Sequence, residues 1–326
     1  MSGTASTEQV PTVAIVVLNW GVTDCLKACL EAVLAQRTRA RLHVLVVDNE
    51  SSAESREQIL GLLDTALPER HVLAWLGLLA VDENRGFAAG MNAGIQMLEG
   101  RFRPDWFWLL NNDAEPAPQA LARLLEVAAE NRRAGMIGSR IEGEALGRGH
   151  PVYGGFHYNP ATTRIKPCLH PDDRPDYLAG AAMLLRAEML RQVGYLSEDY
   201  FLYCEELELA RRAQAHGWQL AHAPESRVRH ASGSSIAARS PLPGRTPDWA
   251  REYFENRSAL RFTMQYHARW LPLVLVIRCL VKLARGLSGR ARFGAFLAAA
   301  RDFRHAGKWM HENTAPPQLV WSKRLD

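Results

Sequence analysis

Polar side chains stand at the ends of four apolar runs in the first half of the chain. Asn19 and Asp48 directly follow two such runs, and later runs are followed by Asn84 with Arg85 and by Asp113. Runs of this kind are typical of buried parallel strands, whose carboxyl ends share one edge of an open sheet, where ligands bind. We therefore expect these five side chains to lie together around one ligand.

A second candidate contact lies at Arg85 and Gly86, just before a predicted helix over residues 87–98. A helix N-terminus favours phosphate, and a glycine there lets a ligand approach the backbone closely. This segment therefore predicts a phosphate contact. Gly180 interrupts a further predicted strand at residues 177–185 and marks another point of close approach.

These residues are positioned by an alternation of strands and helices. We predict strands at residues 13–18, 43–47, 76–81 and 106–110, each followed by a helix, the last of which runs from Pro116 to about Asn131. Such alternation is typical of a parallel sheet covered on both faces. Beyond residue 138 we predict a helix at 204–216, short strands at 218–223 and 227–230, a loop at 232–247, and helices to about Lys308.

The composition agrees with a globular intracellular protein. Hydrophobic residues make up 47% and charged residues 23%, which argues against wholesale disorder. The five cysteines are odd in number in a long chain, so we expect a reducing compartment and no disulfide scaffold. The polar start lacks the apolar stretch of a signal peptide, so we expect a cytoplasmic protein.

Five strings occur in the order typical of one enzyme family. They are residues 17–20 (VLNW), 46–49 (VVDN), 84–94 (NRGFAAGMNAG), 109–113 (LLNND) and 203–209 (YCEELEL). Over residues 13–235 the sequence resembles glycosyltransferase family 2, and especially bacterial rhamnosyltransferases of cell-surface polysaccharide synthesis. The resemblance implies an α/β GT-A fold: a Rossmann-like, mostly parallel central sheet flanked by helices, with a helical C-terminal extension.

The same resemblance implies a division of the chain. We expect a polar tail at residues 1–10 and a catalytic domain at 11–240. Within that domain, residues 11–137 form the nucleotide-binding half and residues 138–240 the acceptor and catalytic half. Residues 241–326 form the basic helical extension.

The resemblance also implies site roles. Asp48 accepts the N3–H of a uracil or thymine ring. The other residues expected around the nucleotide sugar are Asn19, Asn84, Arg85, Gly86, Asn112 and Gly180. Asp113 stands at the second acid of the family's Asp-x-Asp motif, whose first acid is Asn111 here. With His230 it is expected to hold Mg²⁺ or Mn²⁺, since a hard cation prefers oxygen ligands and keeps some waters.

The catalytic base is expected at the Glu205–Glu206 pair, which resembles the family's Glu-Asp pair. Adjacent helical residues point about 100° apart, so only one of them faces the sugar. We assign the base to Glu206 and keep Glu205 as the alternative or as an acceptor contact.

Each of these residues also has an ordinary structural interpretation. Asp48 and Asp113 would then cap the helices that follow them, and His230 would be a hydrogen-bonded residue at a strand end. Glu206 would belong to an acidic helix face, with Glu208 and Arg212 as a surface pair.

The expected activity is an inverting transfer of a sugar, with thymidine-diphosphate rhamnose as the first candidate donor and a UDP-sugar as another. The acceptor is expected to be a glycan or a lipid-linked molecule. A non-catalytic nucleotide-sugar binding protein is the alternative. A nicotinamide oxidoreductase is less favoured, because no Gly-x-Gly-x-x-Gly follows the first strand.

The C-terminal part is strongly basic: nine Lys or Arg lie between Tyr266 and Met310, against the single acid Asp302. Residues 270–284 predict an amphipathic helix that lies on an anionic membrane surface, on the cytoplasmic face. The alternatives are a helix pair that packs on the catalytic domain or forms a homodimer. The sequence contains no visible recognition module for nucleic acid, so we do not expect nucleic acid as a partner.

Overall fold

The computed structural model describes residues 10–21, 23–66, 73–143, 150–230, 240–284, 290–305 and 316–325. The expected polar tail, apart from Val10, lies outside these residues. Residues 232–239 of the expected loop also lie outside them.

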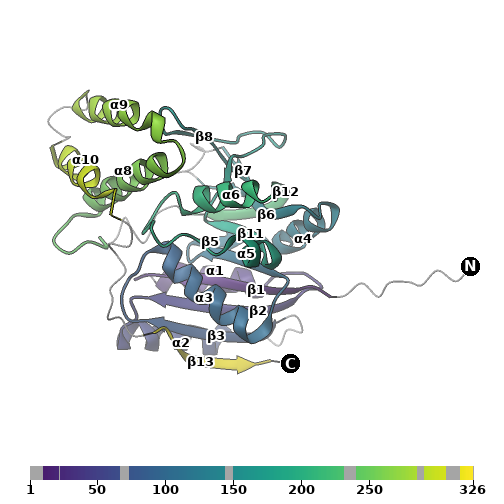
Figure 1. Ribbon diagram of the computed structural model, residues 1–326. Helices are drawn as coiled ribbons and strands as arrows, with labels where there is room; N and C mark the ends of the chain where they lie inside the picture. Colours follow the sequence, from purple (N-terminus) through teal and green to yellow (C-terminus); the bar gives the residue numbers. More distant parts are fainter. Residues whose placement is uncertain are drawn as a thin grey trace, which may run out of the picture.

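The centre of the described structure is a sheet of ten strands in the order β13-β3-β2-β1-β4-β11-β6-β12-β5, with β7 paired to β6 (Figure 1). Its strands are β1 (Thr12–Asn19), β2 (Arg41–Asn49), β3 (Leu73–Val81), β4 (Trp106–Asn111), β5 (Ala114–Pro116), β6 (Ala134–Glu142), β7 (Val152–Tyr153), β11 (Ala182–Arg186), β12 (Gln219–His230) and β13 (Gln318–Arg324). The four strands predicted in the first half, β1 to β4, pair in parallel with one another, which confirms the predicted parallel sheet.

Helices cover both faces of this sheet because side chains alternate along each strand. In β1, Val13, Ile15 and Val17 join the core under α1 (Thr23–Leu34), α2 (Ala53–Ala66) and α4 (Ala120–Glu130). Ala14 and Val16 join the opposite core, under α3 (Phe87–Phe102), α5 (Ala187–Val193) and α6 (Glu205–Ala215). Each fully buried valine or isoleucine contributes about 1.5–3 kcal/mol.

Three predicted boundaries differ from the structure. The strand expected at 177–185 is split at Gly180 into β10 (Tyr177–Leu178) and β11, and β10 belongs to a separate small sheet with β8 (Gly155–Asn159) and β9 (Arg164–Pro167). The two short strands expected at 218–230 are one strand, β12, with an irregularity between Ala223 and Arg227. The helix expected from Pro116 begins at Ala120, because residues 114–116 pair with β12.

The C-terminal part contains α8 (Pro247–Tyr266), the short 3-10 helix η1 (Ala268–Trp270), α9 (Leu271–Ala284) and α10 (Arg290–Asp302), which lie together beside the sheet (Figure 1). Residues 318–324, which we placed in the helical extension, instead form β13, antiparallel to β3 at the sheet edge. Every residue of β3 is buried, and β13 pairs with the backbone groups that this apolar edge would otherwise expose. The division of the chain at residue 240 stays a prediction.

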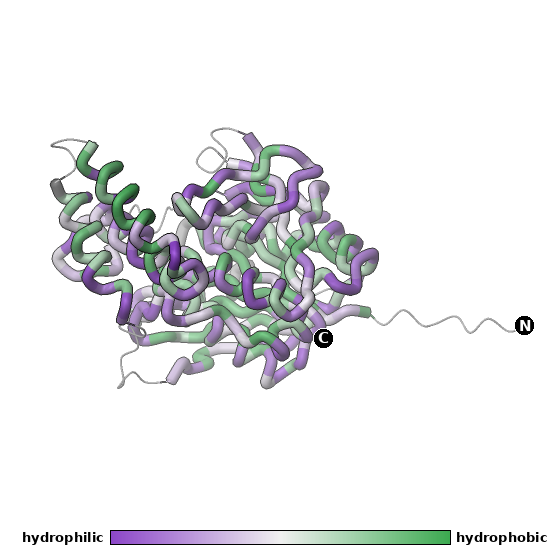
Figure 2. The backbone as a smooth tube through the Cα atoms, turned by 45° about the horizontal axis from the view of Figure 1, so that its top comes forward, coloured by the Kyte–Doolittle hydropathy of each residue, from purple (hydrophilic) through white to green (hydrophobic). Residues whose placement is uncertain are grey.

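The amphipathic helix expected at 270–284 forms as α9, and Figure 2 shows the hydrophobic residues concentrated along it. Large apolar side chains recur at helical spacing on its open face and are 41–59% exposed: Leu273, Val276, Leu280 and Leu283. No helix in the described ranges is long and apolar enough to cross a membrane.

The basic side chains of α9 point inward instead. Arg278 donates to Thr163 Oγ1 at 2.9 Å and to Asn256 Oδ1 at 2.7 Å, and Lys282 forms an ion pair with Glu252. We counted these two cations toward attraction to an anionic surface, and that part of the expectation is wrong. Buried polar groups on α8 and in the turn before β9 bind these two side chains, because a charge that is removed from water needs polar partners.

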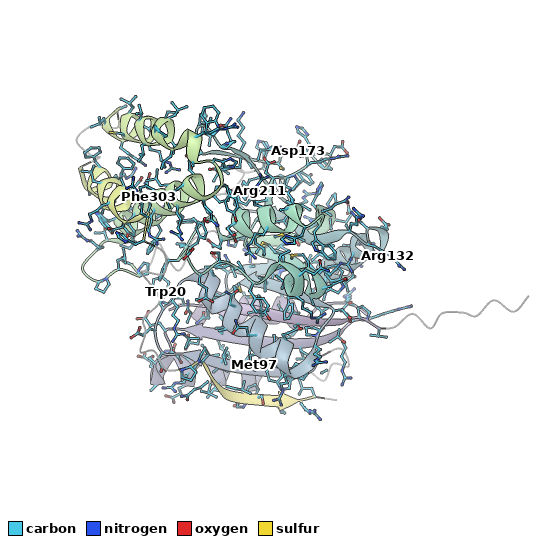
Figure 3. All side chains as sticks on the ribbon, in the orientation of Figure 1. Trp20, Met97, Arg132, Asp173, Arg211 and Phe303 are labelled. Atoms are coloured by element: carbon cyan, nitrogen blue, oxygen red, sulfur yellow. The ribbon has the colours of Figure 1, made fainter. Side chains whose placement is uncertain are left out.

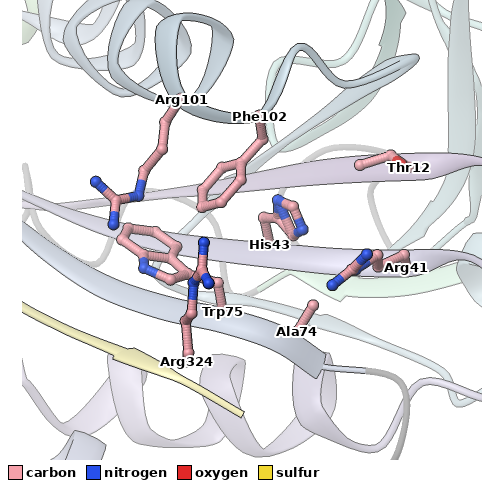
Figure 4. Close-up of a pocket in the computed structure, with 8 residues that line it drawn as sticks. All are labelled: Thr12, Arg41, His43, Ala74, Trp75, Arg101, Phe102 and Arg324. Atoms are coloured by element: carbon pink, nitrogen blue, oxygen red, sulfur yellow. The ribbon is translucent and has the colours of Figure 1, made fainter. Parts of the chain in front are cut away.

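A cavity of about 300 Å³ opens at the amino ends of β1, β2 and β3 (Figure 4). Its lining includes Arg41, His43, Arg101 and Arg324. It lies at the edge of the sheet opposite to the ends that carry Asn19 and Asp48.

Candidate functional site

Asp48 lies in a hydrogen-bonded row at the carboxyl edge of the sheet. The register of β1 and β2 places Asn19 opposite Asp48, and Asn19 Nδ2 donates to Asp48 Oδ1 at 3.4 Å. Ser55 Oγ donates to the other carboxylate oxygen at 2.6 Å, and Asn112 Nδ2 donates to Asn19 Oδ1 at 2.8 Å. Sequence reasoning missed Ser55, whose signal was a hydroxyl in the first turn of the helix that follows Asp48.

Asn84, Arg85 and Gly86 are organised by Asn49, the last residue of β2. Asn49 Nδ2 donates to Asn84 Oδ1 and to the Gly86 carbonyl, both at 3.1 Å, and Asn49 Oδ1 accepts from the Arg85 N–H at 3.3 Å. Asn84 Oδ1 also accepts from the Gly86 N–H at 2.9 Å. Asn49 lies in one of the motif strings, but we gave it no role.

Gly86 has a backbone reason to be glycine. Its φ is 89°, and a Cβ there would come within 2.2 Å of the Phe201 carbonyl oxygen. The N–H of Phe87 donates to the same oxygen at 2.8 Å. The chain's own backbone therefore makes the close approach at Gly86, and it ties the start of α3 to the loop before α6.

Asp113 and His230 meet where β4 turns into β5 and β12 ends. His230 pairs with Ala114 across the β5–β12 ladder, which brings His230 Nε2 within 3.0 Å of Asp113 Oδ1 and 3.3 Å of Asn111 Nδ2. Both the His230 and Asp113 side chains are buried. A carboxylate oxygen beside an imidazole nitrogen is a donor set that fits a divalent cation whose other ligands come from a substrate and water.

Glu206 lies directly over Gly180. A Cβ at Gly180 would come within 2.1 Å of Glu206 Oε1, so a larger residue there would displace the end of this side chain. The next carbonyl, of Ala181, accepts from the Asn111 N–H at 3.1 Å. Glu206 is thereby placed next to the strand end that carries Asn111 and Asp113.

The environments of the two glutamates differ. Burial raises the pKa of Glu206 to about 7. Burial, and then the charge of Glu206, raise the pKa of Glu205 well above its usual range. Glu205 is 2% exposed and its Oε2 has no hydrogen-bond partner in the described structure, whereas Glu206 is half-buried. Glu206 is the one suited to exchange a proton near neutral pH.

The loop that leads into α6 is held by the C-terminal helix α8, in agreement with the alternative that these helices pack on the expected catalytic domain, although the residues that make the contact were not predicted. Arg257 Nη1 donates to the Asp199 carbonyl at 3.0 Å, Arg261 forms an ion pair with the Asp199 carboxylate, and Ser258 Oγ donates to the Leu202 carbonyl at 2.7 Å. These groups are far from Asp199 in sequence, so no local pattern could reveal them.

Glu208 also differs from the surface pair considered above. It is 2% exposed and accepts from Arg212 Nε at 2.7 Å and from the Tyr266 hydroxyl at 2.7 Å. It thus fastens α6 to α8.

The candidate residues follow one another along the carboxyl edge of the sheet. Asn19 donates to Asp48 and accepts from Asn112. The residues on either side of Asn112 in the chain, Asn111 and Asp113, both contact His230. The Asn111 N–H also donates to the Ala181 carbonyl, and the preceding residue, Gly180, faces Glu206. In Figure 3 Trp20, which follows β1, marks this edge on the side where the C-terminal helices lie. Arg85 and Gly86 border the same edge through Asn49.

Residues 11–246 match a family described as glycosyltransferase-like family 2. Over 218 residues the chain is 29% identical to N-acetylglucosaminyl-diphospho-decaprenol L-rhamnosyltransferase of Mycobacterium tuberculosis. That alignment covers 59% of this chain and 68% of the relative.

Two solved structures share the fold. One is GalNAc-T7 with UDP, GalNAc and Mn²⁺, with a TM-score of 0.62 and 14% identity over 90% of this chain and 57% of that one. The other is the mannosyltransferase PcManGT of Pyrobaculum calidifontis with GDP-Man and Mn²⁺, with a TM-score of 0.53 and 16% identity over 90% of this chain and 76% of that one. The expected α/β GT-A architecture is thereby confirmed.

Proposed function

Because this chain is a glycosyltransferase of family 2, we propose that it transfers a sugar with inversion from a nucleoside diphosphate donor to a glycan or lipid-linked acceptor. The observation that carries the proposal is that hydrogen bonds link Asp48 through Asn19 to Asn112, and that the adjoining Asn111 binds the Ala181 carbonyl next to Gly180, which faces Glu206. This arrangement supports a base-binding role for Asp48, a cation site at Asp113 and a proton acceptor at Glu206 along one edge of the sheet.

Asp48 supports recognition of a uracil or thymine ring. Ser55 and Asn19 each donate to one of its oxygens and so orient the carboxylate toward an N3–H donor. Thymidine-diphosphate rhamnose is the first donor to test, because a relative at 29% identity is named a rhamnosyltransferase.

Asp113 and His230 would hold Mg²⁺ or Mn²⁺, with the Asn111 amide close by. A cation bound there neutralises negative charge on the donor diphosphate. The solved GT-A structures named above contain Mn²⁺, which makes it the first ion to test.

Glu206 acts as the general base in this proposal. Its carboxylate takes the proton of the acceptor hydroxyl while that oxygen bonds to the anomeric carbon. The bond from that carbon to the diphosphate breaks on the opposite face, and the nucleoside diphosphate leaves with the electron pair. A positioned base contributes about 10²–10⁴-fold to such a step.

The test is sugar transfer and donor hydrolysis by the purified chain with a panel of nucleotide sugars, with and without a chelator. We expect transfer that a chelator abolishes, and a strong loss in Glu206→Gln but not in the exposed control Glu225→Gln. Tight donor binding without any turnover would instead identify the non-catalytic binding protein. The family match gives the oxidoreductase alternative no support.

The outward apolar face of α9 supports a peripheral location on the inner face of the membrane. We propose that Leu273, Val276, Leu280 and Leu283 enter the bilayer interface, beside the exposed Arg269 and the adjoining Trp270. Each basic residue near an anionic leaflet adds about 1 kcal/mol, so apolar burial is the larger contribution here.

Liposome sedimentation tests this location. We expect binding that the double variant Val276→Ser with Leu280→Ser abolishes and that high salt weakens only partly. Light scattering in the absence of lipid distinguishes the homodimer: a doubled mass that the same variant halves would mean that a second copy covers this face.

A further inference from the structure

Three metal-ligating side chains come together on the small sheet, away from the candidate site. His157 lies in β8, Cys168 follows β9, and Asp173 lies in the loop beyond it; one ligand atom of each lies within 4.8 Å of the others. Figure 3 shows Asp173 in a projecting loop, far from Trp20 at the carboxyl edge.

The spacing of two of these atoms fits a tetrahedral zinc ion. Zinc binds sulfur at about 2.3 Å and imidazole nitrogen at about 2.0–2.1 Å, and a tetrahedral angle then separates the two ligand atoms by about 3.6 Å. In the structure Cys168 Sγ lies 3.6 Å from His157 Nε2.

Backbone contacts hold the ligands in place before any ion binds. The Cys168 N–H donates to the Gly155 carbonyl at 3.0 Å, and its own carbonyl accepts from the Tyr153 N–H at 2.8 Å. Asp173 Oδ2 accepts from the N–H groups of Leu169 and His170, at 2.9 and 3.1 Å. The loop thus folds around the Asp173 carboxylate through Oδ2, and Oδ1 takes no part in these two hydrogen bonds.

A carboxylate also stands behind the histidine. Asp176 Oδ2 lies 3.9 Å from His157 Nδ1 and accepts from the Tyr158 N–H at 2.8 Å. Histidines that bind a metal through one nitrogen commonly give the other N–H to a carboxylate, which orients the ring. Asp176 is placed for this role, on the side of the ring away from Cys168.

We propose that His157, Cys168 and Asp173 form a zinc site that fastens the loop after β9 to the small sheet, with water as the fourth ligand. A nitrogen, sulfur and oxygen donor set selects zinc over Mg²⁺ or Mn²⁺. Zinc binds the thiolate form of cysteine, whereas a metal-free thiol is mostly protonated at neutral pH. Binding therefore releases its proton as the sulfur–zinc bond forms.

The test is a titration of the full, chelator-treated chain with Co²⁺, which takes zinc sites and reports a thiolate ligand through a charge-transfer band. We expect one equivalent with this band and a tetrahedral visible spectrum, both removed by added Zn²⁺. Cys168→Ser should lose the band, and the control Cys279→Ser should keep it. Asp113→Ala should also keep it, which separates this site from the catalytic one.

Asp173→Asn is a second variant, for use if Cys168→Ser fails to fold. The Asp173 side chain is not buried, so this change should leave the fold intact. We expect Co²⁺ affinity to fall at least about 10-fold in this variant, comparable to the loss of an outer partner. Absence of a thiolate band in the wild type, or a band that survives in Cys168→Ser, would overturn the proposal.

Discussion

At the scale of single residues, the site separates two adjacent carboxyl groups by their surroundings. Glu205 is enclosed and, among the residues that the structure describes, lacks a hydrogen-bond partner for one oxygen, while Glu206 faces Gly180. Desolvation disfavours the charged form of both, and the like charge of Glu206 disfavours it further in Glu205. The pair is therefore suited to one proton acceptor beside one neutral acid.

The first prediction concerns the pH dependence of transfer. Glu206 accepts a proton only when ionised, so kcat should rise with pH through about 7 and then level off. In Glu206→Gln the rate should fall by about 10²–10⁴-fold and lose this dependence. A pH–rate profile measured with saturating donor checks this, and an unchanged ascending limb in the variant would assign the base elsewhere.

The second prediction concerns stability. The folded pKa of Glu205 lies above its unfolded value, so its contribution is full below the unfolded pKa and is lost as the pH rises toward the folded pKa. Wild-type Tm should thus decline as the pH rises above about 5, beyond the ordinary glutamate pKa. Glu205→Gln should flatten this decline because an amide does not ionise, and it should gain on wild type by up to about 1.4 kcal/mol for each pH unit above the unfolded pKa over which Glu205 stays protonated.

Thermal melts over that pH range provide the measurement for Glu205. Glu225→Gln, at an exposed position, is the matched control and should leave the slope unchanged. A steeper decline in Glu205→Gln would mean that the wild-type side chain is ionised in the fold.

At the scale of elements, the start of α3 and the loop before α6 are joined through backbone atoms. Gly86 and Phe87 both approach the Phe201 carbonyl, and Asn92 of α3 exchanges hydrogen bonds of 2.9 and 3.1 Å with the backbone of Leu196. These contacts therefore set the candidate phosphate-binding segment relative to the helix that carries Glu205 and Glu206.

The third prediction compares two glycines associated with α3. Gly86→Ala places a methyl group 2.2 Å from the Phe201 oxygen at a φ of 89°, so we expect a loss of at least about 1–3 kcal/mol and a fall in kcat. Gly100→Ala has nothing within 4 Å and should stabilise the helix by about 0.5–1 kcal/mol. Denaturant melts measure the free energy of unfolding of both variants. Equal effects would mean that the contact between the start of α3 and the Phe201 carbonyl does not stabilise the protein.

At the scale of the whole molecule, the C-terminal helix α8 supports α6 and the loop before it. Arg257 and Arg261 of α8 hold Asp199, and Tyr266 holds Glu208 of α6. β13 then returns to the far edge of the sheet beside β3. The segment expected mainly as an anchor thus also braces the site.

The fourth prediction tests this brace. Arg261→Met removes the partner of Asp199, and breaking such a mostly buried pair costs about 3 kcal/mol. Transfer activity should fall at temperatures where the variant is still folded, because the loop into α6 loses its support. Arg251→Met, which breaks an exposed pair with Asp248, should cost under about 1 kcal/mol. Equal activity in both variants would show that the helices do not position Glu206.

Much of this architecture was readable in the sequence because burial leaves a local period. The apolar runs before Asn19, Asp48 and Asn111 predict parallel strands, and strand polarity then brings their ends to one edge whatever the loops do. The motif strings placed the candidate residues on these ends. Helices α1, α3 and α6 could likewise be predicted from their spacing.

Only the tertiary structure decided which side chains meet. It turned Arg278 and Lys282 inward, added β13 to the sheet, and brought His157 to Cys168. A local period reports whether a residue is buried. The identity of its partner depends on packing between segments far apart in the chain, whose free energy no short stretch of sequence contains.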